Sequence, residues 1–508
     1  MGDFRADFTT TMTAPFPSMT ISASGVTPKG SFAAAQATFL RPDPACVDEL
    51  VALLRANNVG LVAHFYMDVE LQGVLTAAMK SWPHIHISDS LVMADRAVSM
   101  AEEGIDAIAV LGVDFMSENV RAVMDAAGHG AVPVYRVDER DIGCSLAASA
   151  EARAYGAWLR KAADTPRSLH VIYINTGLDV KGRAHAAVPT ITCTSSNVVQ
   201  TVLQAAAQIP DLSVWYGPDT YMGDNLRSLF SRLANATDRE VKAVHPLHSP
   251  STIAGLLNRF EVFPQGNCVV HHMFGEDVVR RVRSEHPDAF HTAHLEVPGD
   301  MFELAAESAR HGRGCVGSTS NILNFIADRV SEQLGAHTPA RLQFVLGTEA
   351  GMITAIVERV EGLLKAADRS DIEVEIIFPV ANEAVAIEHD LNLGILPGVA
   401  SGEGCSTSGG CATCPYMKMN TLDALTDVLE AIGNGEDLAA YEPKKYTDLI
   451  AGRTAADIGC EPILHMRHFQ RSGTLPSALV DAVVNTSSPT TLPSTSALQG
   501  RTVALRTA

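Results

Sequence analysis

The chain has 508 residues, 46% of them hydrophobic and 19% charged, a composition that predicts a globular protein and excludes a disordered one. Several domains are expected, because single hydrophobic cores stop growing beyond about 250–300 residues. The 38 basic and 58 acidic side chains give a formal net charge of -20, which argues against nucleic acid as a partner and requires local donors for any small anionic ligand.

The two ends of the chain have the composition of loops. Residues 1–40 are rich in Ser, Thr, Ala and Pro, as are residues 485–500, and neither stretch has a clear periodicity. We therefore expect flexible tails over 1–40 and 471–508. The N-terminus has no apolar run behind a basic start, and its Asp3 and Asp7 are atypical of a transit peptide, so a cytoplasmic protein is expected. No stretch is apolar enough to predict a membrane span.

Between these ends, short β-rich runs alternate with Ala- and Leu-rich helical stretches, which predicts an α/β fold with parallel sheets covered by helices on both faces. Three blocks of similar length suggest related domains over 41–143, 144–265 and 266–400. A cysteine-bearing loop with C-terminal helices follows over 401–470. The predicted strands begin at Leu61, His84, Ala107 and Val132, then at His170, Pro189, Leu212 and Val241, and then at Cys268, Ala289, Gly314, Phe344 and Val374.

Polar residues gather where these strands end, in the sequences AHFY, SDS, YINT, CTSSN, HLEV, GSTS and GTEAG. Ligands of open parallel sheets bind at this edge, so three domains could jointly line one pocket. Each Ser, Thr, Asp or Asn taken alone is equally explained as a helix cap. The additional His, Tyr and Glu side chains, which capping does not require, favour a site.

The nine cysteines predict metal ligation or catalysis, because an odd number spread over a chain without an export signal is not a disulfide framework. Cys405, Cys411 and Cys414 lie within ten residues, and CATC is a CxxC motif. No second CxxC completes a structural zinc site, whereas a proline after Cys414 is typical of iron–sulfur sites. Thioredoxin-like redox chemistry stays open.

Two sets of cysteines could complete an iron–sulfur site with Cys414. Cys144 and Cys268 lie at borders between successive blocks, so each domain would send one thiolate to a common centre. Cys193 is a rival, and spacing alone does not choose between it and Cys268. Three thiolates would leave one iron open as a Lewis acid for a dehydration. Small buried hydrophobes are the expectation for Cys46, Cys315 and Cys460.

In their order along the chain, these motifs resemble those of quinolinate synthase, the iron–sulfur enzyme family of de novo NAD biosynthesis, and look most like its longer plant-type version. The resemblance covers roughly Leu61 to Asn420. It rests on AHFYMDVELQ, SDSL, GVDFMSENV, YINTGLDVK, CTSSNVV, GNCVVHHMF, AHLEVP, VGSTS and CATCPYMKMN.

The resemblance implies three Rossmann-like three-layer α/β/α domains around a pseudo-threefold axis. One four-iron four-sulfur cluster is implied at their junction, held by one cysteine from each domain. On this chain the implied ligands are Cys144, Cys268 and Cys414, which makes Cys193 a bystander. An apparent insertion over 72–86 and Leu295, where the family usually has proline, depart from the pattern.

The implied reaction is the condensation of iminoaspartate with dihydroxyacetone phosphate to quinolinate, phosphate and two waters, catalysed by a transferase with a functional link to an enzyme that produces iminoaspartate. For acid–base catalysis we expect Tyr66 and Glu296, with His64, His271 and His294 orienting substrate or sharing protons. The resemblance further implies substrate binding by His64, Ser90, Tyr173, Asn175, Ser195, His294, Glu296, Ser318 and Thr319.

Two alternative hypotheses stay open. The first is another cluster-dependent hydro-lyase, which would need the same cysteines but not both substrates. The second is a non-catalytic redox or metal-sensing protein in which Cys405, Cys411 and Cys414 switch between thiol and disulfide. Within the main hypothesis, a disulfide between Cys411 and Cys414 would disable the cluster on oxidation.

Overall fold

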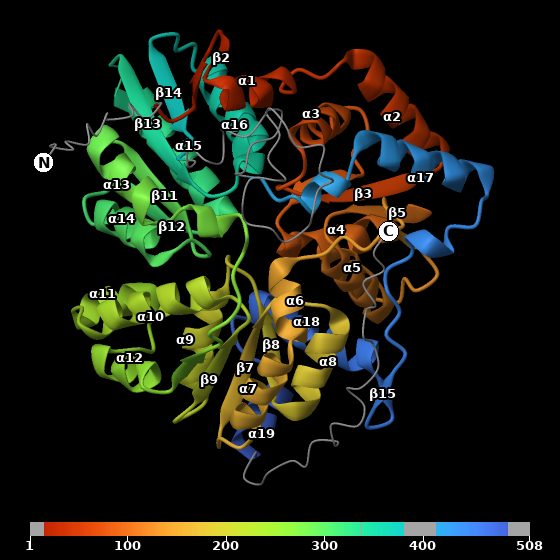
Figure 1. Ribbon diagram of the computed structural model, residues 1–508, viewed down its shortest axis with the longest axis vertical. Coiled ribbons are helices and arrows are strands. Elements are labelled where there is room, and N and C mark those ends of the chain that lie inside the picture. The colour runs from red at the N-terminus through yellow and green to blue at the C-terminus, as the bar shows by residue number, and fades with distance from the viewer. Residues whose placement is uncertain (1–14, 337, 380–412, 486–508) are drawn as a thin grey trace, which may run out of the picture.

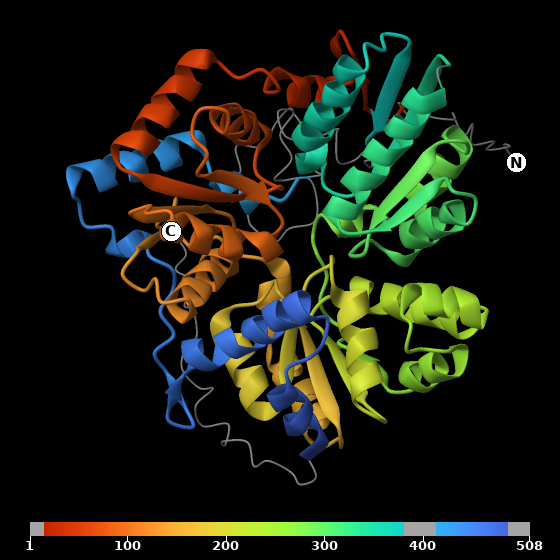
Figure 2. The same cartoon turned by 180° about the vertical axis from the view of Figure 1, so that it is seen from behind.

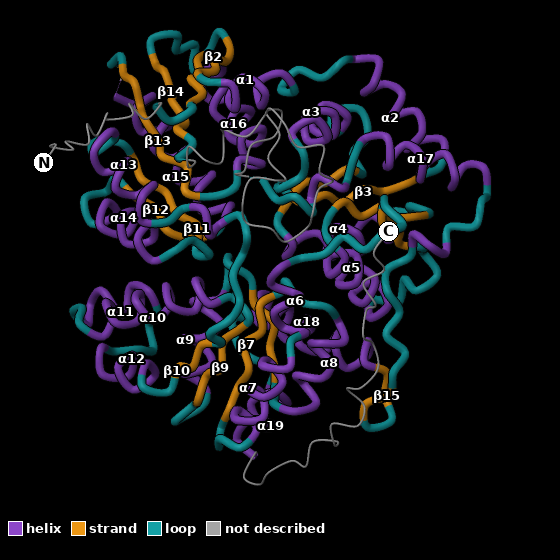
Figure 3. Tube along the Cα trace, in the orientation of Figure 1, coloured by secondary structure: helices purple, strands orange, loops and turns teal. Residues whose placement is uncertain are grey.

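The computed structural model describes residues 15–336, 338–379 and 413–485. Within these ranges the chain forms three larger sheets covered by helices and one short two-stranded sheet (Figure 1, Figure 3). The predicted α/β class is confirmed. The three larger sheets lie in three lobes, and the view from behind shows the same division (Figure 2). The pseudo-threefold relation between the lobes stays a prediction.

The first lobe is built on a parallel sheet with strand order β4-β3-β5-β6. All six residues of β3 are buried, which explains the continuous apolar run in its sequence. Aspartates cap the helices α2, α3 and α4 through backbone N–H groups of the first turn. The elements are α2 Pro44–Ala56, β3 Val59–His64, α3 Val69–Ala78, β4 Ile85–Ser88, α4 Ser90–Glu102, β5 Ala107–Leu111, α5 Asp114–Ala126 and β6 Val134–Arg136.

The second lobe has the parallel order β10-β9-β7-β8. The strand predicted from Val241 is wrong, because a capping box between Thr237 and Glu240 starts a helix there, α11. The fourth strand is β10 instead. The elements are α6 Ser145–Glu151, α7 Arg153–Ala163, β7 Ser168–Tyr173, α8 Leu178–Ala187, β8 Thr190–Cys193, α9 Val198–Gln208, β9 Ser213–Gly217, α10 Thr220–Ala234, α11 Asp238–Val244, α12 Pro250–Leu257 and β10 Phe260–Val262.

The third lobe has the order β12-β11-β13-β14-β1-β2, parallel from β12 to β14. The strand predicted from Cys268 is wrong, since the described chain there is a loop followed by the short 3₁₀ helix η1. The elements from this point on are η1 His271–Met273, α13 Glu276–Glu285, β11 Phe290–His294, α14 Gly299–Ala309, β12 Gly314–Gly317, α15 Thr319–Ala336, β13 Ala340–Gly347, η2 Ala350–Met352, α16 Ile353–Ala366 and β14 Ile372–Ile377.

The N-terminal tail predicted over 1–40 is wrong for its described part. Strands β1 (Ser18–Ser22) and β2 (Gly25–Lys29) form a hairpin, and helix α1 (Ser31–Thr38) follows. Strand β1 pairs antiparallel with β14 and adds the hairpin to the edge of the third sheet. Met19 and Ile21 of β1 are fully buried and alternate with more exposed residues. This alternation with a period of two is typical of a strand, but the Ser- and Thr-rich composition concealed it.

The C-terminal part returns to the first two lobes. Helix α17 packs on α2 of the first lobe, and α18 packs on α8 of the second. The tail predicted over 471–508 is also wrong in part, because Leu479 and Val483 are buried in helix α19. No helix within the described ranges is long and apolar enough to cross a membrane. The elements are η4 Met417–Met419, α17 Leu422–Asn434, η5 Ala439–Tyr441, β15 Leu449–Ile450, β16 Arg453–Thr454, α18 Ala455–Ser472 and α19 Ser477–Asn485.

The buried side of β1 gives a test of the N-terminal hairpin. Replacing Ile21, which is 0% exposed, with alanine should leave a cavity and lower the free energy of unfolding by about 2–5 kcal/mol. Thr20→Ala on the opposite face should change it by less than about 1 kcal/mol. Urea unfolding followed by circular dichroism measures both. Equal stability of the two variants would show that this strand does not pack on the third sheet.

Candidate functional site

One cavity lies where strand ends of the three larger sheets meet. Within each sheet, the strand pairing places neighbouring carboxyl ends side by side. His64 pairs with Ser88, Tyr173 with Cys193, and His294 with Gly317. The predicted site residues that line it are His64, Tyr66, Ser90, Cys144, Tyr173, Asn175, Ser195, Cys268, His294, Glu296, Thr319 and Cys414.

Two predicted residues, His271 and Ser318, are not among the described residues that line this cavity. His271 is fully buried and lies against Glu296. Ser318 precedes α15, and its hydroxyl donates to Asn321 Oδ1 at 2.8 Å while accepting from Asn321 N. Ser318 therefore caps the N-terminus of α15. Helix capping was the other explanation for a serine at the end of a strand.

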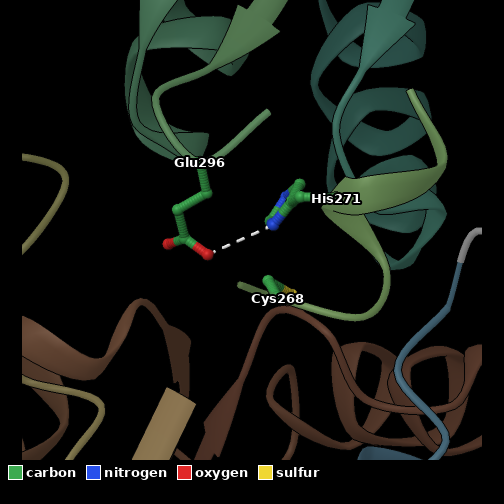
Figure 4. A group of neighbouring side chains, drawn as sticks. All are labelled: Cys268, His271 and Glu296. Carbon is green, nitrogen blue, oxygen red and sulfur yellow. Dashed lines mark ion pairs between the residues drawn. The ribbon is translucent and has the colours of Figure 1, made fainter. Parts of the chain in front are cut away.

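Glu296 is a buried carboxylate with polar partners from two lobes. The Tyr173 hydroxyl donates to Oε1, and His271 Nδ1 lies 3.1 Å from Oε2 (Figure 4). Burial opposes ionisation of Glu296, but His294, His271 and Tyr173 outweigh it and lower its pKa to about 2. The side chain is thus held as an anion next to Cys268, which it approaches together with His271.

The two histidines at the ends of β3 and β11 are neutral, and their tautomers follow from their contacts. Burial lowers the pKa of His64 to about 4 and that of His294 to about 3. Nδ1 of each ring accepts a backbone N–H, from Tyr66 at 3.2 Å and from Glu296 at 3.3 Å. The remaining proton therefore lies on Nε2. In His294 this nitrogen faces the Ser195 hydroxyl at 3.2 Å.

Tyr66 connects the first lobe to the third. Its hydroxyl lies 2.7 Å from Thr319 Oγ1 and 3.1 Å from Thr348 Oγ1. Burial, reinforced by the carboxylates of Glu349 and Glu296, raises the pKa of Tyr66 well above its usual value. Tyr66 is therefore a neutral phenol that can donate a hydrogen bond or a proton into the cavity.

The three predicted cluster cysteines lie in loops just before α6, η1 and η4. Burial raises the pKa of all three thiols, that of Cys144 to about 11, and the charge of Glu296 adds to the effect at Cys268. The loops also touch one another, since Ser145 Oγ donates to Asn267 O at 3.0 Å. Three thiols from separate loops therefore face one cavity.

The remaining described cysteines lie elsewhere. Cys193 is fully buried in β8 and is not among the described residues that line the cavity. Cys460 is buried as expected, whereas Cys46 and Cys315 are only partly buried. Cys405 and Cys411 lie outside the described residues.

Asn420 fastens the loop of Cys414 to the first sheet. Its side chain is 0% exposed, and its Oδ1 accepts from Gly112 N at 3.0 Å at the end of β5. Its Nδ2 donates to Met417 O at 3.1 Å, within the turn that follows Cys414. One amide thus connects this loop to a strand end more than three hundred residues earlier.

Sequence reasoning missed Glu349, which lines the cavity and is 3% exposed. Burial, with Glu296 nearby, raises the pKa of Glu349 well above its usual value. The motif GTEAG after β13 was recognised as a strand end, but nothing in its sequence distinguishes a buried glutamate from an exposed one. Asp89, a cap of α4 that also lines the cavity, was missed for the same reason.

Comparison with known proteins gives concordant matches. The family model described as Quinolinate synthetase A protein matches residues 48–441. A tobacco (Nicotiana tabacum) protein named "Quinolinate synthase, chloroplastic" is 55% identical over 93% of this chain and 67% of its own length. The Arabidopsis thaliana protein of that name is 52% identical over the same shares. The quinolinate synthase of Prochlorococcus marinus (strain MIT 9313) is 26% identical over 77% of this chain and 86% of its own.

The plant matches correct one expectation. The chain spans about two thirds of the length of these relatives, which are named as chloroplastic proteins. The predicted cytoplasmic location is therefore wrong. This prediction rested on the composition of a short N-terminal stretch, which does not determine the compartment in which the folded protein is found. The resemblance to the longer plant-type version, by contrast, is confirmed.

The Asn420 anchor makes the following prediction. Asn420→Ala should leave the buried Gly112 amide without its partner and lower the free energy of unfolding by about 1–3 kcal/mol. Asn434→Ala, at an exposed asparagine at the end of α17, is the matched control and should change it by less than about 0.5 kcal/mol. Denaturant unfolding of the metal-free protein measures both. If Asn420→Ala behaves like the control, this amide does not hold the loop.

Proposed function

We propose a reaction for this chain on the ground that it belongs to the quinolinate synthase family. The reaction is the condensation of iminoaspartate with dihydroxyacetone phosphate to quinolinate, phosphate and two waters. One observation carries the proposal. The cavity that contains three cysteine thiols also contains the ionised Glu296 and the neutral Tyr66 and His294. Thiols for a metal centre and groups for proton transfer thus share one space.

The donor set fits an iron–sulfur cluster held by Cys144, Cys268 and Cys414. Thiols whose pKa is raised by burial are poor anions by themselves, and a metal centre supplies the positive charge that makes them thiolates. His271 and Glu296 lie beside Cys268, but they are already engaged with each other. When bound, a three-cysteine cluster supplies an open iron that acts as a Lewis acid toward a substrate oxygen.

Anionic substrates find local donors in this acidic protein. Ser90 and Thr319 are the first residues of α4 and α15, so both cavity-lining hydroxyls lie at helix N-termini, which favour carboxylate and phosphate groups. Asn175 and Ser195 add an amide and a hydroxyl from the second lobe. These four side chains support the binding of iminoaspartate and of the phosphate ester.

The proton-transfer roles follow from protonation state. Glu296 is an anion, so it is the member of the pair Glu296 and Tyr66 that can accept a proton as the new bonds form, and its pKa of about 2 makes it a weak base. Tyr66 keeps its proton and is suited to donate it to a departing hydroxyl. His294, with its proton on Nε2 toward Ser195, orients substrate within the cavity. Iminoaspartate must be delivered by an enzyme that oxidises aspartate, and we propose a functional link to such an enzyme.

The proposal is tested by anaerobic purification and incubation with freshly generated iminoaspartate and dihydroxyacetone phosphate. We expect quinolinate and phosphate in equal amounts, detected by chromatography, and no product when either substrate is omitted. Turnover of one hydroxy acid alone would favour the alternative hydro-lyase. An iron-loaded protein without activity toward either would favour the sensor hypothesis and contradict the proposal.

Cysteine variants test the ligand set separately from activity. Cys268→Ser should lose the visible absorption of the cluster and most of the bound iron, because it removes one of three thiolates. Cys193→Ser is the matched control from the rival position in β8 and should retain both. Iron and sulfide are measured in anaerobically purified protein. Retention of the cluster in Cys268→Ser, or its loss in Cys193→Ser, would reverse the assignment.

A further inference from the structure

Residues 442–472, which we call the C-terminal strap, lie beyond the part of the chain that the family model matches, residues 48–441. The strap contains β15, β16 and α18. Figure 2 shows its long helix, in blue, across the back of the second lobe. Nothing in the proposed mechanism uses this segment, although one of its side chains reaches the interior beside the cavity.

The strap packs closely on helices of two lobes. Glycines allow α18 to approach α8, since a Cβ atom at Gly459 would collide with the carbonyl oxygen of Leu178. On the other side, Cys460 Sγ contacts Ala122 O of α5 at 3.4 Å, and Arg467 forms an ion pair with Asp95 of α4. The strap therefore spans the boundary between the first and second lobes.

Tyr446 of the strap makes the contact that matters for the site. Its hydroxyl donates to Glu118 Oε1 at 2.9 Å, and Glu118 Oε2 accepts the backbone N–H of Leu178 at 3.0 Å. Glu118, on α5 of the first lobe, is 2% exposed. A buried carboxylate thus joins the strap to the first residue of α8, directly after the strand-end motif YINTG.

Lys181 completes the link from α8 to the cavity. It is fully buried, and its Nζ donates to Ile174 O at 3.0 Å and to Thr176 O. These two carbonyl groups flank Asn175, whose side chain lines the cavity next to Tyr173. Because a buried ammonium without acceptors is costly, these two contacts fix the backbone of this loop relative to α8.

We infer that Tyr446 is a positioning residue of the active site, which acts through Glu118 and the start of α8 to hold the loop that carries Tyr173 and Asn175. The inference deepens the proposed function and rests on it for the identity of the ligand. The C-terminal strap is thereby a working part of the site, although it lies outside the region shared with the wider family. Loss of the Tyr446 hydroxyl should loosen this loop and weaken substrate binding more than turnover.

The test compares Tyr446→Phe with Tyr441→Phe. Each removes one hydroxyl that interacts with a glutamate, but the partner of Tyr441 is Glu139, away from the cavity. In Tyr446→Phe we expect the KM for iminoaspartate and the Kd for quinolinate to rise about 3- to 10-fold, with kcat and iron content within about 2-fold of wild type. Tyr441→Phe should leave all four unchanged. An unaltered KM and Kd in Tyr446→Phe would overturn the inference.

Two further measurements separate this inference from the proposed function. Amide hydrogen exchange of the peptide over 174–178 should be faster in Tyr446→Phe than in Tyr441→Phe, and this holds even if the wild-type chain makes no quinolinate. Glu118→Ala should raise the KM at least as much, and adding Tyr446→Phe to it should have no further effect, because both act through one contact. Unchanged exchange, or additive effects, would show that Tyr446 does not act through Glu118.

Discussion

The buried carboxylate of Glu296 is the interaction on which the site depends. It follows β11 in the third lobe and is 4% exposed, yet one of its oxygens accepts a hydrogen bond from the Tyr173 hydroxyl of the second lobe. An ionised carboxylate without partners in such a place would cost several kcal/mol. His294 and His271 of the same lobe stabilise this anion, and the Tyr173 hydroxyl of the second lobe adds to their effect, so docking of the two lobes contributes to the chemistry of the site.

The first lobe is attached in a comparable way. The Tyr66 hydroxyl reaches Thr319 and Thr348 of the third lobe, and the Asn420 amide ties the loop of Cys414 to the end of β5. These are hydrogen bonds between buried polar groups, which are costly to leave unpaired and therefore set the relative position of the lobes. The C-terminal strap, which lies beyond the residues that the family model matches, adds a fourth connection.

Much of this could be predicted from the sequence, and the failures have physical causes. Strands such as β3 and β7 are buried along their whole length and are largely apolar, so their ends, with His64 and Tyr173, were found. The segment at Val241 has the composition of a strand, but its capping box makes it a helix. Short β1 was hidden by its Ser and Thr content. Glu349 and Tyr446 could not have been found, because their burial depends on contacts with residues distant in the sequence.

We propose that three cysteines hold a cluster whose open iron faces the cavity containing Glu296. The most direct test is Mössbauer spectroscopy of the anaerobic protein loaded with iron-57, with and without quinolinate. We expect one iron to differ from the other three and its signal alone to shift when quinolinate binds. Spectra that stay unchanged while quinolinate binding is demonstrated in the same sample would contradict it.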